Sequence, residues 1–305
     1  MPRRDVMDAP DEPTLAFDPS TGRPILVAPQ RRHRPLHTHG RASGPCPFCP
    51  GEEHQTPSEV DAVRAAGDRN EPGWRVRAFP NLYPASHWHE VIVEGAEHET
   101  RPHRVPPAIW LDALDVYRRR ISAMEAQRDV QCAFLFKNVG REAGASIEHN
   151  HTQLLGLTLL PPRLELELRA SRGACPWCAE VESAPTEGRA LFVGEHHVVL
   201  CPRYPKLPHE LWLVPRRHDT NFLVQGPAAS EELSTLLPRL FGAVDAALDG
   251  AAFNVFLHRI PGEDFHWHFE LQPRTGYLAG LELGGDMYIN SISSRESADL
   301  LRPHF

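Results

Sequence analysis

The feature that most constrains the fold is an internal repeat, because the motifs of the first half recur in the same order in the second half. Each half has a CxxC pair, then a tyrosine, a His-Glu dipeptide, a further histidine and an HxH motif. The matched residues are Cys46 and Cys175, Cys49 and Cys178, Tyr83 and Tyr204, His89 and His209, Glu90 and Glu210, His98 and His218, His149 and His266, and His151 and His268. The spacing between partners shortens slowly and never reverses, as expected after a duplication with small deletions. We therefore expect two similar domains, 1–165 and 166–305, divided near the prolines of LLPPRLELELRASRG.

Each half reads as strands, one helix and further strands. Runs rich in β-branched and aromatic residues predict strands at 74–79, 89–94, 132–138, 152–160, 190–193, 210–215, 253–258 and 267–273. Apolar residues at helical spacing predict one helix within 106–129 and its counterpart within 230–248. The pattern favours an α+β fold of two duplicated domains, each an antiparallel sheet backed by a helix.

Composition excludes several classes of protein. A net charge of -8 argues against a nucleic-acid binder that works through a broad basic face. The amino terminus has no apolar signal segment, and no apolar run approaches the length of a membrane-spanning helix. We therefore expect a cytoplasmic protein with no nucleic-acid or membrane partner.

The six cysteines divide into two groups. Cys132 and Cys201 lie in apolar, strand-like runs and are expected to be buried packing residues. The other four form the two CxxC pairs, and a CxxC pair alone is equally compatible with redox chemistry. Here each pair recurs with matched histidines, which predicts two Cys2His2 zinc sites. The proposed ligand sets are Cys46, Cys49, His98 and His149 in the first half, and Cys175, Cys178, His218 and His266 in the second.

The first HxH motif places His149, His151 and Gln153 on one side of an extended chain, because alternate residues of a strand share a face. His149 is assigned to a metal set, and His151 and His268 are not. His151 is then held beside a closed metal site without being bound by it. His268 is equally consistent with a hydrogen-bonded strand histidine of no chemical role.

These motifs together resemble the galactose-1-phosphate uridylyltransferase family, a branch of the histidine-triad superfamily, over nearly the whole chain. The similar segments are DPSTGRPILVAPQRRHRP, CPFCPGEEHQTP, VRAFPNLYPA, FKNVGREAGASIEHNHTQ and GLELGGDMYINSI, the last also similar to a plant ADP-glucose phosphorylase. The resemblance implies two histidine-triad-like domains and ping-pong transfer of a nucleoside monophosphate through a covalent nucleotidyl-histidine at His151. Neutral imidazole suits this role, since it attacks phosphorus and leaves again without a metal.

The resemblance also implies the roles of other residues. Gln153 and Ser146 are expected to act with His151, by donating hydrogen bonds to the phosphate oxygens. The expected substrate-binding residues are Arg31, Arg34, Asn81, Asn138, Gly144, Ser146 and Gln153, with the backbone of GREAGAS forming an anion-binding nest. Family members are dimers, so a homodimer is expected.

The sequence departs from the family pattern at several positions. HNH replaces the usual HPH, Leu82 stands where an acidic residue often follows the pocket asparagine, and TGYLAGLE lacks a lysine before its G-x-E. The last two departures favour adenine over uridine nucleotides.

Some members hold iron in the second half through one glutamate and three histidines. His258, His266 and His268, with Glu165 or Glu167, can mimic that set, but the two thiolates of Cys175 and Cys178 favour zinc.

Three functions remain open from the sequence. The first is a nucleotidyltransferase of carbohydrate metabolism, such as galactose metabolism, that acts on a nucleotide sugar and a sugar 1-phosphate. The second is an ADP-glucose or dinucleoside-polyphosphate phosphorylase that uses the same histidine with inorganic phosphate. The third is a zinc-containing nucleotide-binding protein without turnover.

Overall fold

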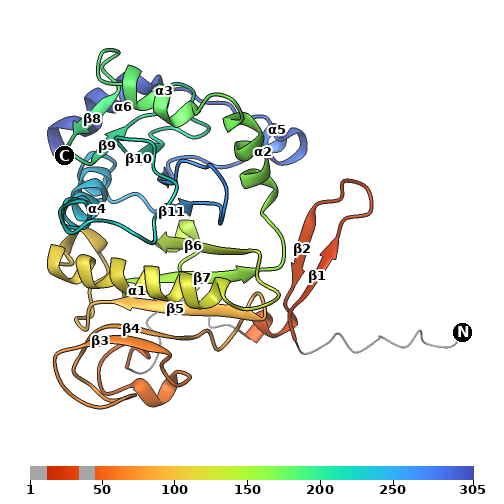
Figure 1. Ribbon diagram of the computed structural model, residues 1–305, viewed down its shortest axis with the longest axis vertical. Helices are drawn as coiled ribbons and strands as arrows, with labels where there is room; N and C mark the ends of the chain where they lie inside the picture. Colours follow the sequence, from red (N-terminus) through yellow and green to blue (C-terminus); the bar gives the residue numbers. More distant parts are fainter. Residues whose placement is uncertain (1–11, 34–44) are drawn as a thin grey trace, which may run out of the picture.

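The computed structural model describes residues 12–33 and 45–305 (Figure 1). Within these ranges the strands form a β1–β2 hairpin, which projects from the side of the molecule, and one ten-stranded antiparallel sheet. The strands are β1 (Thr14–Phe17), β2 (Pro24–Val27), β3 (Asp61–Arg64), β4 (Trp74–Pro80), β5 (Trp88–Glu94), β6 (Cys132–Val139), β7 (His151–Leu157), β8 (Ala190–Val193), β9 (His197–Leu200), β10 (Leu211–Pro215), β11 (Phe253–His258) and β12 (His268–Pro273).

The order of the strands displays the internal repeat. The sheet runs β3-β4-β5-β7-β6-β11-β12-β10-β9-β8, so each half contributes five strands in the same order from the edge inward. The halves join where β6 pairs with β11, with Phe136 opposite its own counterpart Phe256. The pairing is symmetric about this point, since Leu135 faces Leu257 and Lys137 faces Val255. The two predicted sheets, one in each half, are therefore continuous with one another.

Two long helices, α1 (Pro107–Glu125) and α4 (Pro227–Ala247), back the sheet and pack against each other. Both contribute to one buried apolar cluster that includes strand residues of both halves. The other helices are α2 (Pro162–Ser171), α3 (Pro176–Ser183), α5 (Gly280–Gly285), α6 (Ser294–Leu301) and the 3-10 turns η1 (Pro29–His33), η2 (Glu53–Gln55), η3 (Pro102–Arg104), η4 (Arg141–Ala143) and η5 (Arg302–His304).

Alternation along β7 separates the packing face from the functional face. Thr152 and Leu154 lie on the side of α1, where the Tyr117 hydroxyl group is 2.9 Å from Thr152 Oγ1. His151 lies on the opposite face, where its ring contacts Phe48 at a centroid distance of 5.2 Å. Gln153 shares this face by strand alternation and lines the same pocket as His151, whereas His149 lies two residues before the start of β7.

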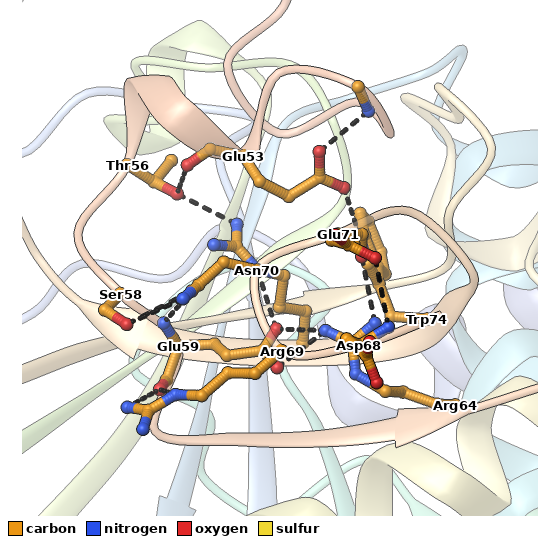
Figure 2. Close-up of polar contacts among 12 residues, drawn as sticks. Glu53, Thr56, Ser58, Glu59, Arg64, Asp68, Arg69, Asn70, Glu71 and Trp74 are labelled. Carbon is orange, nitrogen blue, oxygen red and sulfur yellow. Dashed lines mark hydrogen bonds and ion pairs between the residues drawn. The ribbon is translucent and has the colours of Figure 1, made fainter. Parts of the chain in front are cut away.

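The segment that follows the first CxxC pair is anchored to β3 and β4 by a polar network (Figure 2). The buried carboxylate of Glu53 accepts a 2.8 Å hydrogen bond from the indole N–H group of Trp74. The carboxylate of Glu59, also buried, is paired with Arg64 at 2.5 Å and with Arg77 at 3.2 Å. Buried carboxylates require such partners, so the network fixes the wall that carries Phe48 beside His151.

The predicted α+β fold of duplicated halves is confirmed, with α1 and α4 at the expected positions. The division at residue 165 stays a prediction, and this position lies within α2. The short strands β1, β2, β3 and β9 and the helices α2, α3, α5 and α6 were not predicted. No helix in the described part of the chain is long and apolar enough to cross a membrane.

Candidate functional site

The first predicted ligand set comes together on the face of the sheet opposite α1. Its four donor atoms, from Cys46, Cys49, His98 and His149, all lie within 4.8 Å of one another. Nδ1 of His149 is 3.8 Å from Cys46 Sγ and 3.6 Å from Cys49 Sγ, and Nδ1 of His98 is 3.3 Å from Cys49 Sγ. Two ligands of one tetrahedral ion, at about 2.3 Å for sulfur and about 2.0 Å for nitrogen, lie about 3.5 Å apart, so this set can hold a metal ion.

The second set repeats this arrangement in the other half. Nδ1 of His266 is 3.6 Å from Cys175 Sγ and 3.5 Å from Cys178 Sγ, and Nδ1 of His218 is 3.4 Å from Cys178 Sγ. The ring nitrogen of His266 that faces away from the sulfurs lies 3.1 Å from the carbonyl oxygen of Pro215. In the first set, His149 Nε2 lies 3.0 Å from the carbonyl oxygen of Gly95. Such a carbonyl partner fixes the tautomer of a ligating histidine and orients its ring.

The thiols of these sets need a cation in order to ionise. Burial, together with the neighbouring Cys49, raises the pKa of Cys46 to about 11. A pair of half-buried thiolates is therefore stable at neutral pH only beside a positive charge, which is the condition that a bound metal ion meets.

A third group of metal-binding side chains lies in the second half. It comprises Glu167, His258, His268 and Glu270, with donor atoms within 4.8 Å of one another. Glu167, His258 and His268 belong to the set that the sequence suggested as a mimic of the iron site. The third histidine of that set, His266, lies with Cys175 and Cys178 instead. Glu165 lies on the exposed side of α2, where it pairs with Arg169 at 3.4 Å.

His151 is buried and its tautomer is fixed by the main chain. Nδ1 lies 2.8 Å from the carbonyl oxygen of His149, which can only accept, so Nδ1 carries the proton and Nε2 carries the lone pair. Burial, with a smaller contribution from the nearby Lys137 ammonium, lowers the pKa of His151 to about 4. At neutral pH the ring is therefore an uncharged nucleophile with Nε2 as its reactive atom.

A buried ion pair supports the strand behind His151. Lys137 Nζ lies 2.7 Å from Glu94 Oε2 and donates a 2.8 Å hydrogen bond to the carbonyl oxygen of His151. The Tyr117 hydroxyl group donates to the other carboxylate oxygen of Glu94 at 2.5 Å. The backbone of the nucleophile is thus tied to β5, β6 and α1 at once.

His89, which was not predicted as a site residue, orients Gln153. The N–H group of Ala85 donates a 3.0 Å hydrogen bond to His89 Nδ1, so the ring proton resides on Nε2. His89 Nε2 lies 3.0 Å from Gln153 Oε1 and donates to it. With its oxygen engaged, Gln153 can turn its amino group toward the pocket that it lines. The recurrence of the His-Glu dipeptide in both halves is the sequence signal that marks this position.

An apolar pocket of about 250 Å³ opens beside His151. Phe48, Phe79 and Val91 line it, together with Asn81, whose Oδ1 accepts a 2.8 Å hydrogen bond from the N–H group of Tyr83. The remaining lining residues are Pro47, Gln55, Thr56, Pro57, Leu82, Tyr83, Ser146, Ile147, His151 and Gln153. An aromatic pocket with a few polar groups suits a nucleoside.

The loop between β6 and β7 forms the boundary of this pocket. Gly140 and Gly144 have φ values of +83° and +87°, which a residue with a Cβ rarely adopts. Ser146 lines both this pocket and a second cavity of mixed polar and apolar lining, which Asn138 also lines. Gly144, predicted to bind substrate, lines neither space, and a Cβ built on it would be 3.8 Å from Asn138 Nδ2.

The structure therefore brings together most of the predicted site residues. His151, Gln153, Ser146 and Asn81 line one pocket, and Asn138 lines the adjoining cavity. Arg31 lies at the edge, where its guanidinium group donates a 2.8 Å hydrogen bond to the carbonyl oxygen of Tyr83. Arg34 lies outside the described residues.

The corresponding place in the second half is filled. Trp177, the counterpart of Phe48, lies over the ring of His268 at 4.6 Å with an interplanar angle of 31°, whereas Phe48 meets His151 edge-on at 74°. Glu270 stands where Gln153 stands in the first half, and its carboxylate is paired with Arg163 and Lys206. A carboxylate, unlike the amide of Gln153, has no N–H group to donate to a phosphate oxygen, so this half does not repeat the arrangement of the first half.

The chain is similar along its length to two kinds of curated protein. It is 25% identical over 332 residues to the ADP-glucose phosphorylase of Arabidopsis thaliana, covering 95% of this chain and 92% of that protein. It is also 25% identical over 314 residues to the galactose-1-phosphate uridylyltransferase of Thermotoga maritima, covering 94% and 97%. No family model matches the chain.

Solved structures of the same two kinds share the fold. An ADP-glucose phosphorylase from Arabidopsis thaliana with bound ADP-glucose superposes with a TM-score of 0.75 at 24% identity, covering 95% of this chain and 99% of that chain. A uridylyltransferase structure superposes with a TM-score of 0.79 at 25% identity, covering 95% and 98%. The predicted resemblance is confirmed, and so is the predicted class, since both kinds of relative are nucleotidyl-transferring enzymes.

Proposed function

We propose that this relative of the galactose-1-phosphate uridylyltransferases transfers a nucleoside monophosphate from a nucleotide sugar to a hexose 1-phosphate, through a covalent nucleotidyl-histidine at His151. The observation that carries the proposal is the state of this one imidazole. It is neutral, its Nδ1–H group is bonded to the His149 carbonyl oxygen, and its ring lines a nucleoside-sized pocket.

The chemistry follows from these contacts. In the first step the lone pair of His151 Nε2 attacks the α-phosphorus, and the bond to the bridging oxygen breaks as the sugar 1-phosphate leaves with that electron pair. In the second step a phosphate oxygen of the acceptor attacks the same phosphorus, and the electron pair of the N–P bond returns to Nε2. The Gln153 amide and the glycine-containing loop donate hydrogen bonds to the phosphate oxygens during both steps.

We assign the two Cys2His2 sets to zinc. Two thiolates and two imidazoles at tetrahedral spacing are a donor set that zinc prefers, and neither set keeps an open position for a substrate. Zinc in the first set would hold His149, and thereby the carbonyl group that bonds His151. Iron in the second set is the alternative for that half.

Inorganic phosphate is the second candidate acceptor. It would make the protein an ADP-sugar or dinucleoside-polyphosphate phosphorylase, as the name of the Arabidopsis relative suggests. Leu82 favours this alternative with an adenine nucleotide, because its exposed side chain lines the pocket without offering a carboxylate to the base. A nucleotide-binding protein without turnover is the candidate of another class.

The assembly and setting are part of the same proposal. Exposed apolar side chains on the projecting hairpin, including Phe17, Ile25 and Leu26, and on the segment with Leu283 and Ile289, support a homodimer. We place the enzyme in the cytoplasm and in carbohydrate metabolism, with a nucleotide sugar and a sugar 1-phosphate or phosphate as its partners.

The direct test is to incubate the protein with UDP-glucose or ADP-glucose, without acceptor, and to measure the mass of the intact chain. We expect an acid-labile nucleoside monophosphate adduct that is absent in His151→Asn, and the donor that reacts faster identifies the base. Galactose 1-phosphate or inorganic phosphate is then added to identify the acceptor. Absence of an adduct from both nucleotide sugars, and from a dinucleoside polyphosphate offered as a third donor, would leave only the non-catalytic alternative.

A further inference from the structure

His151 lies where the hydrogen-bonded ladders of β7 end. On one side, β5 pairs with β7 as far as Val93 opposite His151. On the other side, β6 pairs with β7 as far as Phe136 opposite Gln153. Main-chain groups at the end of a ladder need partners of another kind. The position of His151 therefore depends on contacts made outside the regular strand pairs.

Asn150 supplies these contacts on the side of β5. Its carbonyl oxygen accepts a 3.3 Å hydrogen bond from the N–H group of Glu94, and its own N–H group donates a 2.9 Å bond to the carbonyl oxygen of Glu99. The N–H group is thus turned away from β5. The side-chain Nδ2 takes its place by donating to the carbonyl oxygen of Glu94 at 3.2 Å. A side-chain amide therefore completes the pair of bonds that two opposite residues of an antiparallel ladder normally exchange.

The main-chain contact of Asn150 also fixes the tautomer of His151. The N–H group of Asn150 and the carbonyl oxygen of His149 belong to one peptide unit, which is planar. That carbonyl oxygen accepts the hydrogen bond from His151 Nδ1. The bond from Asn150 to Glu99, the residue after His98, therefore sets the direction of the carbonyl oxygen that the ring of His151 meets.

The second half repeats the main-chain contact without the side-chain contact. Trp267, the counterpart of Asn150, donates its N–H group to the carbonyl oxygen of Asp219 at 3.1 Å. Its indole ring lies in the apolar core, and the ladder between β10 and β12 stops one residue short of His268. The main-chain contact is therefore common to both halves, whereas the amide contact belongs to the half that carries His151.

Burial shows which atom determines how the Asn150 side chain lies. The residue is buried, and its Oδ1 has no hydrogen-bond partner among the residues that the structure describes. An unpaired buried carbonyl group is unfavourable, so the contact from Nδ2 to Glu94 orients the side chain. Glu94 is itself held, because its carboxylate is paired with Lys137, which also donates to the carbonyl oxygen of His151. Contacts on both sides of His151 thus lead to Glu94.

We propose that Asn150 is a positioning residue for the reaction at His151. Its N–H group fixes the carbonyl oxygen that sets the tautomer, and its side-chain amide holds the end of β7 against Glu94. Nε2 of His151 then keeps one place and one direction while phosphorus is attached and released. This inference rests on the proposed function for the reaction, and on the strand contacts for the position of the ring. Loss of these contacts lowers the rate of both chemical steps without weakening nucleotide binding.

The test measures the rate of adduct formation from the nucleotide sugar that reacts faster, and the rate of its discharge by galactose 1-phosphate. Asn150→Leu keeps the N–H group but lacks the amide, so both rates should fall roughly tenfold with little change in KM. Asn150→Pro also lacks the N–H group and should lower both rates roughly 10²-fold.

The matched control is Gln127→Leu, which removes an amide donor from the carbonyl oxygen of Ala123. Gln127 lines neither the apolar pocket nor the second cavity, so this variant should change neither rate. Unfolding temperatures verify that each variant folds. If Asn150→Pro does not fold, Asn150→Leu carries the test.

Measurements on the resting protein separate this inference from the proposed function. ¹⁵N NMR should place the ring proton of His151 on Nδ1 in the wild type and give a mixture of tautomers in Asn150→Pro. The Glu94 N–H group should exchange with deuterium faster in Asn150→Leu than in the wild type. If the wild type forms no adduct while these differences are found, the proposed function fails and the positioning role is supported. If both folded variants react at wild-type rates, with tautomer and exchange unchanged, the positioning role is overturned while the function is supported.

Discussion

The Nδ1–H group of His151 donates a 2.8 Å hydrogen bond to the carbonyl oxygen of His149. His149 itself presents Nδ1 to the two cysteine sulfurs and Nε2 to the carbonyl oxygen of Gly95. A residue of the first Cys2His2 set therefore fixes the tautomer of His151, two positions further along the chain. This arrangement allows a metal site to serve the reaction without touching the reacting phosphorus.

His151→Gln should abolish the nucleotidyl adduct, with a fall in turnover of at least about 10³-fold, because the substituted side chain supplies no nucleophile. The matched control is His268→Gln at the corresponding position of the second half, which should keep adduct formation because Trp177 covers that ring. Adduct mass, with thermal unfolding to confirm the fold, checks both variants. An adduct of normal yield in His151→Gln would contradict the assignment.

Removal of single metal ligands should separate the two clusters. Elemental analysis should find about two zinc ions per chain, and Cys46→Ser and Cys175→Ser should each remove one and lower the unfolding temperature. Only Cys46→Ser should also slow adduct formation, since its cluster holds His149. Equal loss of activity in both variants would show that the second cluster acts on the site as well.

His89→Leu should lower kcat by roughly 10²-fold with little change in KM, because the Gln153 amide loses the partner that orients it toward the phosphate. His89→Gln should restore part of the rate, since a glutamine amino group can replace the Nε2–H donor. Steady-state kinetics with the nucleotide sugar that reacts faster measures kcat and KM separately for each variant.

His87→Leu is the control for that variant, because His87 is an exposed neighbour that contacts Trp88 and lies outside the apolar pocket. It should leave both constants unchanged. A His89→Leu enzyme that loses only substrate affinity would show that His89 shapes the pocket and does not position Gln153.

Cys132 and Cys201 should resist alkylation in the native protein at pH 8. Burial raises the pKa of each thiol to about 12, so the reactive thiolate is present at about one part in 10⁴ at that pH and appears only as the pH approaches 12. Peptide mass spectrometry after iodoacetamide treatment, with and without denaturant, measures the protection. Rapid native modification of these two cysteines would contradict the packing of β6 and the end of β9.

The internal repeat made the centre of the fold predictable from the sequence. Matched motifs imply matched strands. The equivalent strands β6 and β11 pair with each other, with Phe136 opposite its counterpart Phe256, as the repeat leads one to expect. The Cys2His2 sets were predictable for the same reason, since residues that recur in register are brought together in the same way. α2 was missed because Pro161 and Pro162 indicated a boundary, although proline is also favoured in the first turn of a helix.

The contacts that orient the site were not predictable. His89 meets Gln153 across 64 residues, and Asn254 meets Asn138 across 116, so neither pair leaves a local pattern. The His89 tautomer depends on one main-chain N–H group, that of Ala85, which a sequence pattern does not specify. The residues proposed to react could therefore be predicted from the sequence. The residues that orient them could be identified only from the structure, which shows how the strands pair.

The most direct test of the account is the identity of the nitrogen that carries the nucleotide. We predict that the adduct, formed on protein labelled with ¹⁵N in its histidine rings, gives one ³¹P signal coupled to Nε2 of His151, because Nδ1 is committed to the His149 carbonyl oxygen. Coupling to Nδ1, or attachment to any residue other than His151, would contradict it.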